Sequence, residues 1–263
     1  MNSTQGTALI TGASSGLGAR YATELAARGF DLVLVARNAD RLSALAESIT
    51  SDTGRRVDVL AADLTDKSGL AAVEARLVDD QTITLLVNNA GGSLFGPVGG
   101  ADVEAYENLI ALNITALTRL TNAVLPGFQA RNAGTIVNVG SAMTFLIMPV
   151  SAVYSATKSY VLAFTQSLQL QLADTGIRVQ AVLPGAVRTD FWGGSGIELS
   201  DLPDEMVMSV EDAVDAALAG LDAGELVTIP ALEESAHWET LDAHRNELAG
   251  IVSRSEKASR YRN

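Results

Sequence analysis

The chain has 263 residues, of which 48% are hydrophobic and 19% are charged, and its formal net charge is −13. This composition fits a globular protein with a sizeable core, and the negative charge argues against nucleic acid as a partner. With no cysteine and only His237 and His244 as histidines, disulfides, thiol nucleophiles and Cys-ligated zinc are excluded, and we expect no metal site.

Short apolar runs alternate with longer amphipathic segments along the chain. Runs rich in Val, Ile and Leu that bury both faces are typical of parallel strands covered by helices. Seven such strands are expected at 7–11, 31–36, 57–62, 83–89, 134–140, 177–184 and 225–229. The sequence therefore predicts an α/β protein with a Rossmann-type doubly wound fold, in which helices flank a seven-stranded parallel sheet.

No repeat or Pro/Gly-rich linker divides the chain, so we expect a single domain over residues 1–263. The irregular stretch 190–206 follows a strand end, which is typical of a substrate loop, although a surface excursion is the alternative. A C-terminal helical segment is expected at about 231–255. The N-terminus lacks the pattern of a signal peptide, and no unbroken apolar run reaches membrane-span length. We therefore expect a cytoplasmic protein with no membrane partner.

The turn after the first strand, TGASSGLG at 11–18, fits two motifs. Gly12, Gly16 and Gly18 form the spacing of a phosphate-binding turn, whereas Ser14 between two glycines fits the nucleophile elbow of a serine hydrolase. An elbow needs earlier strands to supply an oxyanion N–H, and only six residues precede this strand. The histidines follow Ser14 in hydrolase order, but they lie in a polar helical stretch. We interpret the turn as dinucleotide-binding, with Ser14 and Ser15 as phosphate or ribose ligands.

The second strand is followed by Arg37, with Arg41 one helical turn further on. An acidic residue here would accept hydrogen bonds from a free ribose 2′-hydroxyl, whereas a guanidinium suits a 2′-phosphate. A solvated arginine at the start of a helix is the alternative. The residue type favours NADPH over NADH.

Tyr154 and Lys158, in YSATK, stand four residues apart on a predicted helix and so share one face. A cation about 4 Å from a tyrosine favours its phenolate by roughly 4 kcal/mol at an effective dielectric constant of about 20. This corresponds to about three pKa units before desolvation is counted. The pair could therefore form a general acid/base, although a surface Tyr–Lys pair is the alternative.

Several motifs, in this order, resemble those of the short-chain dehydrogenase/reductase family. They are TGASSGLG, the Asp63 of AADLTD, NNAG at 88–91, the Asn113 of LNIT, the Ser141 of VGSA, YSATK and PGAVRT at 184–189. The resemblance implies a catalytic tetrad of Asn113, Ser141, Tyr154 and Lys158. It implies cofactor contacts from Gly12, Ser14, Ser15, Gly16, Leu17, Gly18, Arg37, Asp63, Leu64, Asn89, Ala90, Gly91, Tyr154, Lys158, Pro184, Gly185, Val187 and Thr189.

The resemblance also implies roles. Tyr154 would donate a proton, Ser141 would hold the substrate carbonyl, and Lys158 would bind the nicotinamide ribose and lower the Tyr154 pKa. Asn113 would hold a water, Asp63 the adenine amino group and Thr189 the carboxamide. NADPH-preferring members of the family often carry a basic residue where Ser15 stands, so recognition of the 2′-phosphate would rest mainly on Arg37.

Apolar side chains near these positions suggest the walls of a substrate pocket: Met143, Met148, Phe191 and Trp192. Core packing is the alternative for each. The family resemblance implies reversible reduction of ketones, aldehydes or ketoesters with NADPH/NADP, by a homo-oligomer that is a dimer or tetramer. The alternatives are a 3-oxoacyl-carrier-protein reductase and a non-catalytic dinucleotide-binding sensor.

Overall fold

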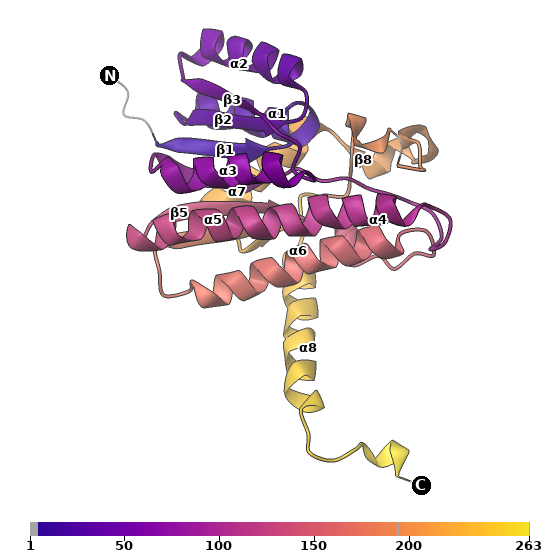
Figure 1. Cartoon of the computed structure of the whole chain (residues 1–263). Coiled ribbons are helices and arrows are strands. Elements are labelled where there is room, and N and C mark those ends of the chain that lie inside the picture. The colour runs from indigo at the N-terminus through magenta and orange to yellow at the C-terminus, as the bar shows by residue number, and fades with distance from the viewer. Residues whose placement is uncertain (1–4, 194, 263) are drawn as a thin grey trace. The chain divides into compact units, whose positions relative to one another are not determined.

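The computed structural model describes residues 5–193 and 195–262. The chain divides into two compact units, Met1–Pro230 and Ala231–Asn263. The first unit contains a seven-stranded parallel sheet with the order β3-β2-β1-β4-β5-β6-β9 (Figure 1). Its strands are β1 Thr7–Thr11, β2 Asp31–Ala36, β3 Val57–Ala61, β4 Ile83–Asn88, β5 Gly134–Val139, β6 Ile177–Val182 and β9 Val227–Thr228. These are the seven expected strands, and their bounds agree within two residues, so the predicted fold class is confirmed.

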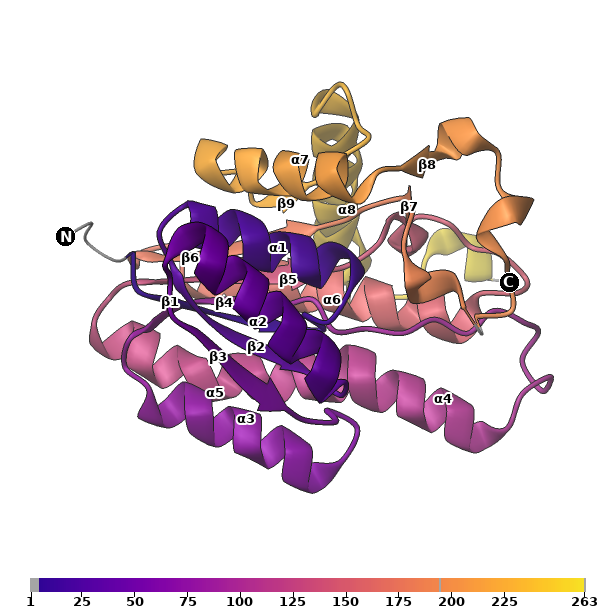
Figure 2. The same cartoon turned by 90° about the horizontal axis from the view of Figure 1, so that it is seen from above.

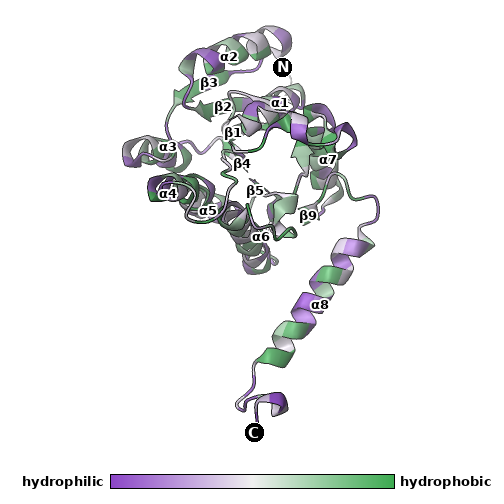
Figure 3. Ribbon diagram, turned by 90° about the vertical axis from the view of Figure 1, so that its right-hand side faces the viewer, coloured by the Kyte–Doolittle hydropathy of each residue, from purple (hydrophilic) through white to green (hydrophobic). Residues whose placement is uncertain are grey.

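Six helices flank this sheet and form two layers. They are α1 Gly16–Ala27, α2 Ala39–Thr53, α3 Lys67–Asp79, α5 Leu117–Ala130, α6 Ala152–Gln171 and α7 Val210–Ala223. Helices α1, α2 and α7 bury apolar residues on one face, and α3, α5 and α6 on the other (Figures 2 and 3). Successive strand residues point to opposite faces, so Ile10 packs with the first layer and Leu9 with the second. This explains the continuous apolar runs of the sequence.

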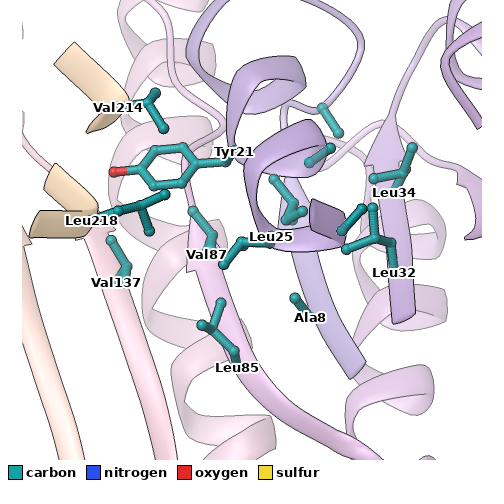
Figure 4. Close-up of a cluster of buried hydrophobic side chains, with 14 of the residues drawn as sticks. Ala8, Tyr21, Leu25, Leu32, Leu34, Leu85, Val87, Val137, Val214 and Leu218 are labelled. Carbon is teal, nitrogen blue, oxygen red and sulfur yellow. The ribbon is translucent and has the colours of Figure 1, made fainter. Parts of the chain in front are cut away.

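Tyr21, on α1, is one of the largest fully buried side chains. Its ring packs beside Val214 and Leu218 of α7 and Val137 of β5 (Figure 4). The hydroxyl has no hydrogen-bond partner within the part of the chain that the structure describes, and burial raises the pKa of this phenol. Tyr21 therefore contributes apolar area to the core while its polar atom is left unsatisfied.

A long helical stretch carries Asn113. Helix α4 Val103–Ile110 continues through a π-helical turn, η1 Ala111–Ala116, into α5. The stretch Val103–Ala130 is long and apolar enough, by length and composition, to cross a membrane, and it is the one such helix among the described residues. Polar residues interrupt the apolar side chains of this helix, so it contains no unbroken apolar run of membrane-span length. Leu120, Val124 and Phe128 of α5 are core residues, as is common in the core helix of a globular protein.

The stretch 190–206, which was expected to be a substrate loop, is flanked by two short strands. Strand β7 Ala186–Val187 pairs in parallel with β8 Val207–Met208 in a second, two-stranded sheet. Between them lie three 3-10 turns, η3 Asp190–Trp192, η4 Leu199–Asp201 and η5 Asp204–Met206. Arg188 forms an ion pair with Asp204 at 3.0 Å, so both ends of the stretch 190–206 are held together. Short strands of two residues carry too little periodicity to be recognised from sequence.

The second unit contains α8 Ala236–Val252 and η6 Ser259–Tyr261. One further 3-10 turn, η2 Ala142–Thr144, belongs to the first unit. Helix α8 lies within the segment 231–255 that was expected to be helical. A single domain over the whole chain stays a prediction.

Candidate active site

The glycine turn connects β1 to α1. Gly12 adopts φ +66°, and a Cβ atom on Gly18 would collide with the carbonyl oxygen of Gly12 and the side-chain amide of Asn89. The turn thus requires glycine for both its backbone shape and its close packing. Ser15 is the N-cap of α1, yet its side chain makes no capping hydrogen bond. The first amides of α1 are therefore available to an anionic ligand at the positive end of the helix.

Asn89 braces this turn from the end of β4. Its side-chain amide donates to the carbonyl oxygens of Thr11 and Gly12 at 2.9 and 3.3 Å. The backbone amides of Asn89 and Ala90 both donate to the Thr11 hydroxyl at 3.0 Å. The NNAG segment thus supports the turn directly, and the arrangement fits the pyrophosphate of a dinucleotide.

Asp63 and Arg37 follow β3 and β2 on the same edge of the sheet. The backbone and side-chain hydrogen bonds from Thr65, at 2.9 and 2.7 Å, lower the pKa of Asp63, and the charge of Arg37 adds to this effect. Both bonds reach one carboxylate oxygen of Asp63. Leu64 beside it is buried. A carboxylate held ionised in this way is suited to accept a hydrogen bond from an amino group such as that of adenine.

The two arginines of this region differ. Arg41 forms an ion pair with Asp190 at 3.4 Å, across to the stretch 190–206. Arg37 is exposed and has no ion pair among residues 5–193 and 195–262. Arg37 is therefore the guanidinium that is open to a further anion.

The tetrad residues come from three elements, and two of them, Asn113 and Lys158, lie beside Gly91. A Cβ atom on Gly91 would lie 3.3 Å from Asn113 Oδ1 and 3.4 Å from Lys158 Nζ. Lys158 Nζ donates to the carbonyl oxygen of Val139, at the end of β5, at 3.0 Å. Ser141 lies near enough to the Tyr154 phenol to lower its pKa. Ser141 lies two residues after β5 and Tyr154 in the first turn of α6, so the strand end and the helix together form the site.

Asn113 is fixed by three hydrogen bonds. Its amide nitrogen donates to the carbonyl oxygen of Gly92 and to the Thr157 hydroxyl, both at 3.0 Å, and its Oδ1 accepts from Gly92 N–H at 2.9 Å. Thr157 in turn donates to the carbonyl oxygen of Tyr154 at 2.8 Å. The π-helical turn places Asn113 where it joins the loop after β4 to the helix of Tyr154, as irregular helical turns often do at functional sites.

Burial dominates the ionisation of the two central groups. Tyr154 is 5% exposed, and burial raises the pKa of Tyr154 to about 12, although the nearby Ser141 side chain opposes this rise. Burial also lowers the pKa of Lys158 to about 8. The expected lowering of the Tyr154 pKa by Lys158 is therefore wrong for this structure. The ammonium lies 5.9 Å from the centre of the Tyr154 ring, and its nitrogen donates to the carbonyl oxygen of Val139.

The PGAVRT segment, 184–189, lies between the residues around Ser141 and the glycine turn. Pro184 accepts a hydrogen bond from Ala142 N–H at 2.8 Å, and Gly185 has open space around its Cα. Thr189 contacts Gly16, because a Cβ atom on that glycine would lie 2.9 Å from the Thr189 methyl group. The Thr189 hydroxyl also accepts from Phe191 N–H at 3.3 Å. The segment therefore joins the cofactor turn to the expected pocket residues.

Residues 6–197 match the sequence profile described as short chain dehydrogenase. The chain belongs to this family. A short-chain dehydrogenase from Sphingobium yanoikuyae, solved with NADPH, is 49% identical, with a TM-score of 0.94 over 97% of this chain and 100% of its own. A bulky-bulky ketone specific alcohol dehydrogenase from Comamonas testosteroni is 43% identical, with a TM-score of 0.90 over 98% and 99%. An uncharacterized oxidoreductase from Staphylococcus haemolyticus is 33% identical over 77% of this chain and 90% of its own.

The four side chains expected to line the substrate pocket differ in their exposure and in their contacts with Tyr154. The Phe191 ring contacts that of Tyr154, and the Trp192 ring contacts that of Phe191. Met148, in contrast, is 42% exposed. Met143 donates its backbone N–H to the Ser141 hydroxyl at 3.1 Å. The sequence analysis missed Phe95, whose ring centre lies 5.4 Å from that of Tyr154. Its position four residues after NNAG was the signal that could have identified it.

Proposed function

We propose that the protein is an NADPH-dependent carbonyl reductase that reversibly converts ketones, aldehydes or ketoesters to alcohols. The observation that carries this proposal is the convergence of Ser141, Tyr154 and Lys158 beside the braced glycine turn. The NADPH in the complex from Sphingobium yanoikuyae and the ketone specificity named for the Comamonas testosteroni enzyme support it.

The residues around the turn fit an NADP dinucleotide. The amides at the start of α1 would hold the pyrophosphate and the Asp63 carboxylate the adenine. Arg37, which has no ion pair within the described ranges, would hold the 2′-phosphate. Thr189 lies beside Gly16 and so would meet the nicotinamide end. When bound, this cofactor supplies the hydride that the carbonyl carbon accepts.

The protein groups would move the proton. Tyr154 is fully protonated at neutral pH because burial raises its pKa to about 12, so it can donate to the carbonyl oxygen as negative charge develops there. Ser141 would give a second hydrogen bond to the same oxygen. Lys158, with a pKa lowered to about 8, retains most of its charge at neutral pH and would bind the hydroxyls of the nicotinamide ribose. Asn113 would hold a water that resupplies the proton.

The function is tested with purified protein, a panel of carbonyl compounds and either NADPH or NADH, followed by cofactor absorbance. We expect oxidation of NADPH by ketones in preference to NADH. Turnover restricted to acyl thioesters would instead identify a 3-oxoacyl-carrier-protein reductase. Tight NADPH binding with no oxidation by any carbonyl compound would favour a non-catalytic dinucleotide-binding sensor and would contradict the proposal.

Cofactor choice is tested at Arg37. We expect Arg37→Ala to raise the KM for NADPH by about tenfold or more and to leave that for NADH nearly unchanged, because only NADPH loses a charge-assisted contact. Arg56→Ala is the matched control, since Arg56 is also an exposed arginine but follows α2 at its far end. An equal change for both cofactors in Arg37→Ala would show that Arg37 does not bind the 2′-phosphate.

We further propose that the enzyme is a cytoplasmic homo-oligomer, a dimer or tetramer, that pairs through the helices carrying Asn113 and Tyr154. Exposed apolar side chains on these helices support self-association: Val103 is 62% exposed and Leu170 81% exposed. Light scattering should give a mass of two or four chains, and Leu170→Glu should lower it. A monomer at micromolar concentration would contradict this proposal.

A further inference from the structure

Four aromatic rings, one of them the phenol of Tyr154, form a closed cycle of contacts. Phe95 meets Tyr154 edge-on, with ring centres 5.4 Å apart and planes at 63°, and lies parallel to Trp192 at 6.4 Å and 6°. Trp192 meets Phe191 edge-on at 5.9 Å and 88°, and Phe191 returns to Tyr154 at 6.1 Å and 50°. All four separations fall in the range of favourable ring contacts. We call Phe95, Tyr154, Phe191 and Trp192 the aromatic cycle.

The chain holds Phe95 in place from both sides. Its backbone N–H donates to the carbonyl oxygen of Ser195 at 2.7 Å, and the next amide, of Gly96, donates to Val150 at 2.7 Å. Ser195 is buried. A Cβ atom on Gly196 would lie 2.6 Å from the Phe95 carbonyl oxygen, so this close approach requires glycine. Phe95 therefore joins the loop after β4 to the stretch 190–206 and to the segment that precedes α6.

Trp192 is fixed as well. Its indole N–H donates to the carbonyl oxygen of Val187 at 2.9 Å, which satisfies the one polar atom of the side chain and leaves the ring face for apolar contact. Phe191 is positioned by the bond from its N–H to Thr189. The rings opposite Tyr154 are thus oriented by backbone contacts, as a preorganised pocket requires.

A substrate carbonyl must reach a Tyr154 that is only 5% exposed. A substituent on its carbonyl carbon would therefore lie against the rings of the cycle that contact Tyr154. A planar aromatic substituent makes ring-to-ring contacts, whereas a saturated ring of the same size offers area but no π face. None of the four side chains carries a charge at neutral pH, so a charged substituent would lose hydration without a partner.

We propose that Phe95 is a specificity-determining residue which, with Phe191 and Trp192, selects carbonyl compounds that carry an aromatic ring on the carbonyl carbon. This inference rests on the proposed carbonyl reduction and names its substrate class. Phe95 contributes a wall of the pocket and holds the stretch 190–206 beside it.

The test measures binding, so it is independent of turnover. The chain contains two tryptophans, and Trp238→Phe leaves Trp192 as the single fluorescent indole in the cycle. In this background, with NADP present, acetophenone and cyclohexyl methyl ketone are titrated and the change of Trp192 fluorescence is followed. We expect acetophenone to bind about three- to tenfold more tightly, which is the range of an aromatic contact beyond its area.

Phe95→Leu keeps much of the apolar volume and removes the ring. We expect it to abolish the preference for acetophenone. Phe164→Leu is the matched control, because Phe164 also stacks on a tyrosine, Tyr160, at 5.8 Å but lies outside the cycle. It should retain the preference.

Equal affinity for the two ketones, no measurable binding of either, or an unchanged preference in Phe95→Leu would overturn the proposal. Preferential binding of acetophenone without oxidation of NADPH would contradict the proposed function and leave the role of Phe95 supported. The two failures are therefore distinguishable.

Discussion

The glycine turn and the tetrad place their functional groups by different means. At the turn, missing side chains allow the backbone to approach itself closely, and one asparagine, Asn89, fixes the result. At the tetrad, polar side chains are buried and held by hydrogen bonds, as Lys158 is by Val139 and Asn113 by Gly92. Backbone amides need no desolvation of a charge, whereas the tetrad keeps an ammonium under apolar cover. The buried groups of the tetrad should therefore lower the free energy of unfolding, whereas the glycine turn should not.

The largest effect is expected at the tetrad and on catalysis alone. Tyr154→Phe retains the ring contacts with Phe95 and Phe191 but removes the proton donor. We expect kcat to fall by about 10²- to 10⁴-fold, while the Kd for NADPH changes less than about twofold. Single-turnover kinetics and a fluorescence titration measure the two. Activity near the wild-type level would show that another group donates the proton.

A change at the turn should damage binding and stability together. Gly18→Ala brings a Cβ atom against the Gly12 carbonyl oxygen and the Asn89 amide, so the turn must shift. We expect a loss of about 1–3 kcal/mol in the free energy of unfolding and weaker NADPH binding. Gly185→Ala is the control, because nothing lies within 4 Å of its Cβ position. Equal losses in the two variants, by urea unfolding, would contradict the role of close packing.

The stability cost of the tetrad should appear in pH dependence. Burial lowers the pKa of Lys158 to about 8, whereas an unfolded lysine ionises near about 10.4. Between these values the unfolded chain holds a proton that the folded chain lacks, so this group makes stability rise with pH. Below about pH 8 both states are charged and the cost is at its full size.

Lys158→Met tests this point. We expect the variant to be inactive, more stable than the wild type at pH 7 by about 1–3 kcal/mol, and to lack the rise between pH 8 and 10. Urea unfolding at pH 7 and 9.5 measures both. A variant that is less stable at pH 7 would show that the bond to Val139 outweighs the cost of burial.

The smallest effect concerns a buried phenol outside the site. Tyr21→Phe removes a hydroxyl that has no partner among the described residues and keeps the ring between α1 and α7. We expect a change between zero and a gain of about 1 kcal/mol in the free energy of unfolding, with activity unchanged. A loss above 1 kcal/mol would indicate a bound water on the hydroxyl. Tyr21 thereby sharpens the contrast with Tyr154, whose hydroxyl we propose as the proton donor.

The sequence predicted the seven strands because parallel strands bury both faces and so appear as unbroken apolar runs. The glycine turn could be identified because Gly12, Gly16 and Gly18 lie within one short segment. The sequence could not predict that burial outweighs Lys158 at Tyr154, since the 5.9 Å separation and the exposure of Tyr154 depend on tertiary packing. Phe95 was missed for a related reason: its place shortly after NNAG hints at the site, but its contact with Trp192 joins residues 97 positions apart.

The central claim is that hydride and proton reach one carbonyl group in this site, with Tyr154 as the proton donor. The most direct measurement uses acetophenone and NADPH deuterated on the transferring position of the nicotinamide, with the alcohol analysed by mass spectrometry. The account predicts one deuterium on the carbinol carbon with the wild type and almost none with Tyr154→Phe. NADPH binding with no deuterated alcohol, or equal yields from both proteins, would contradict it.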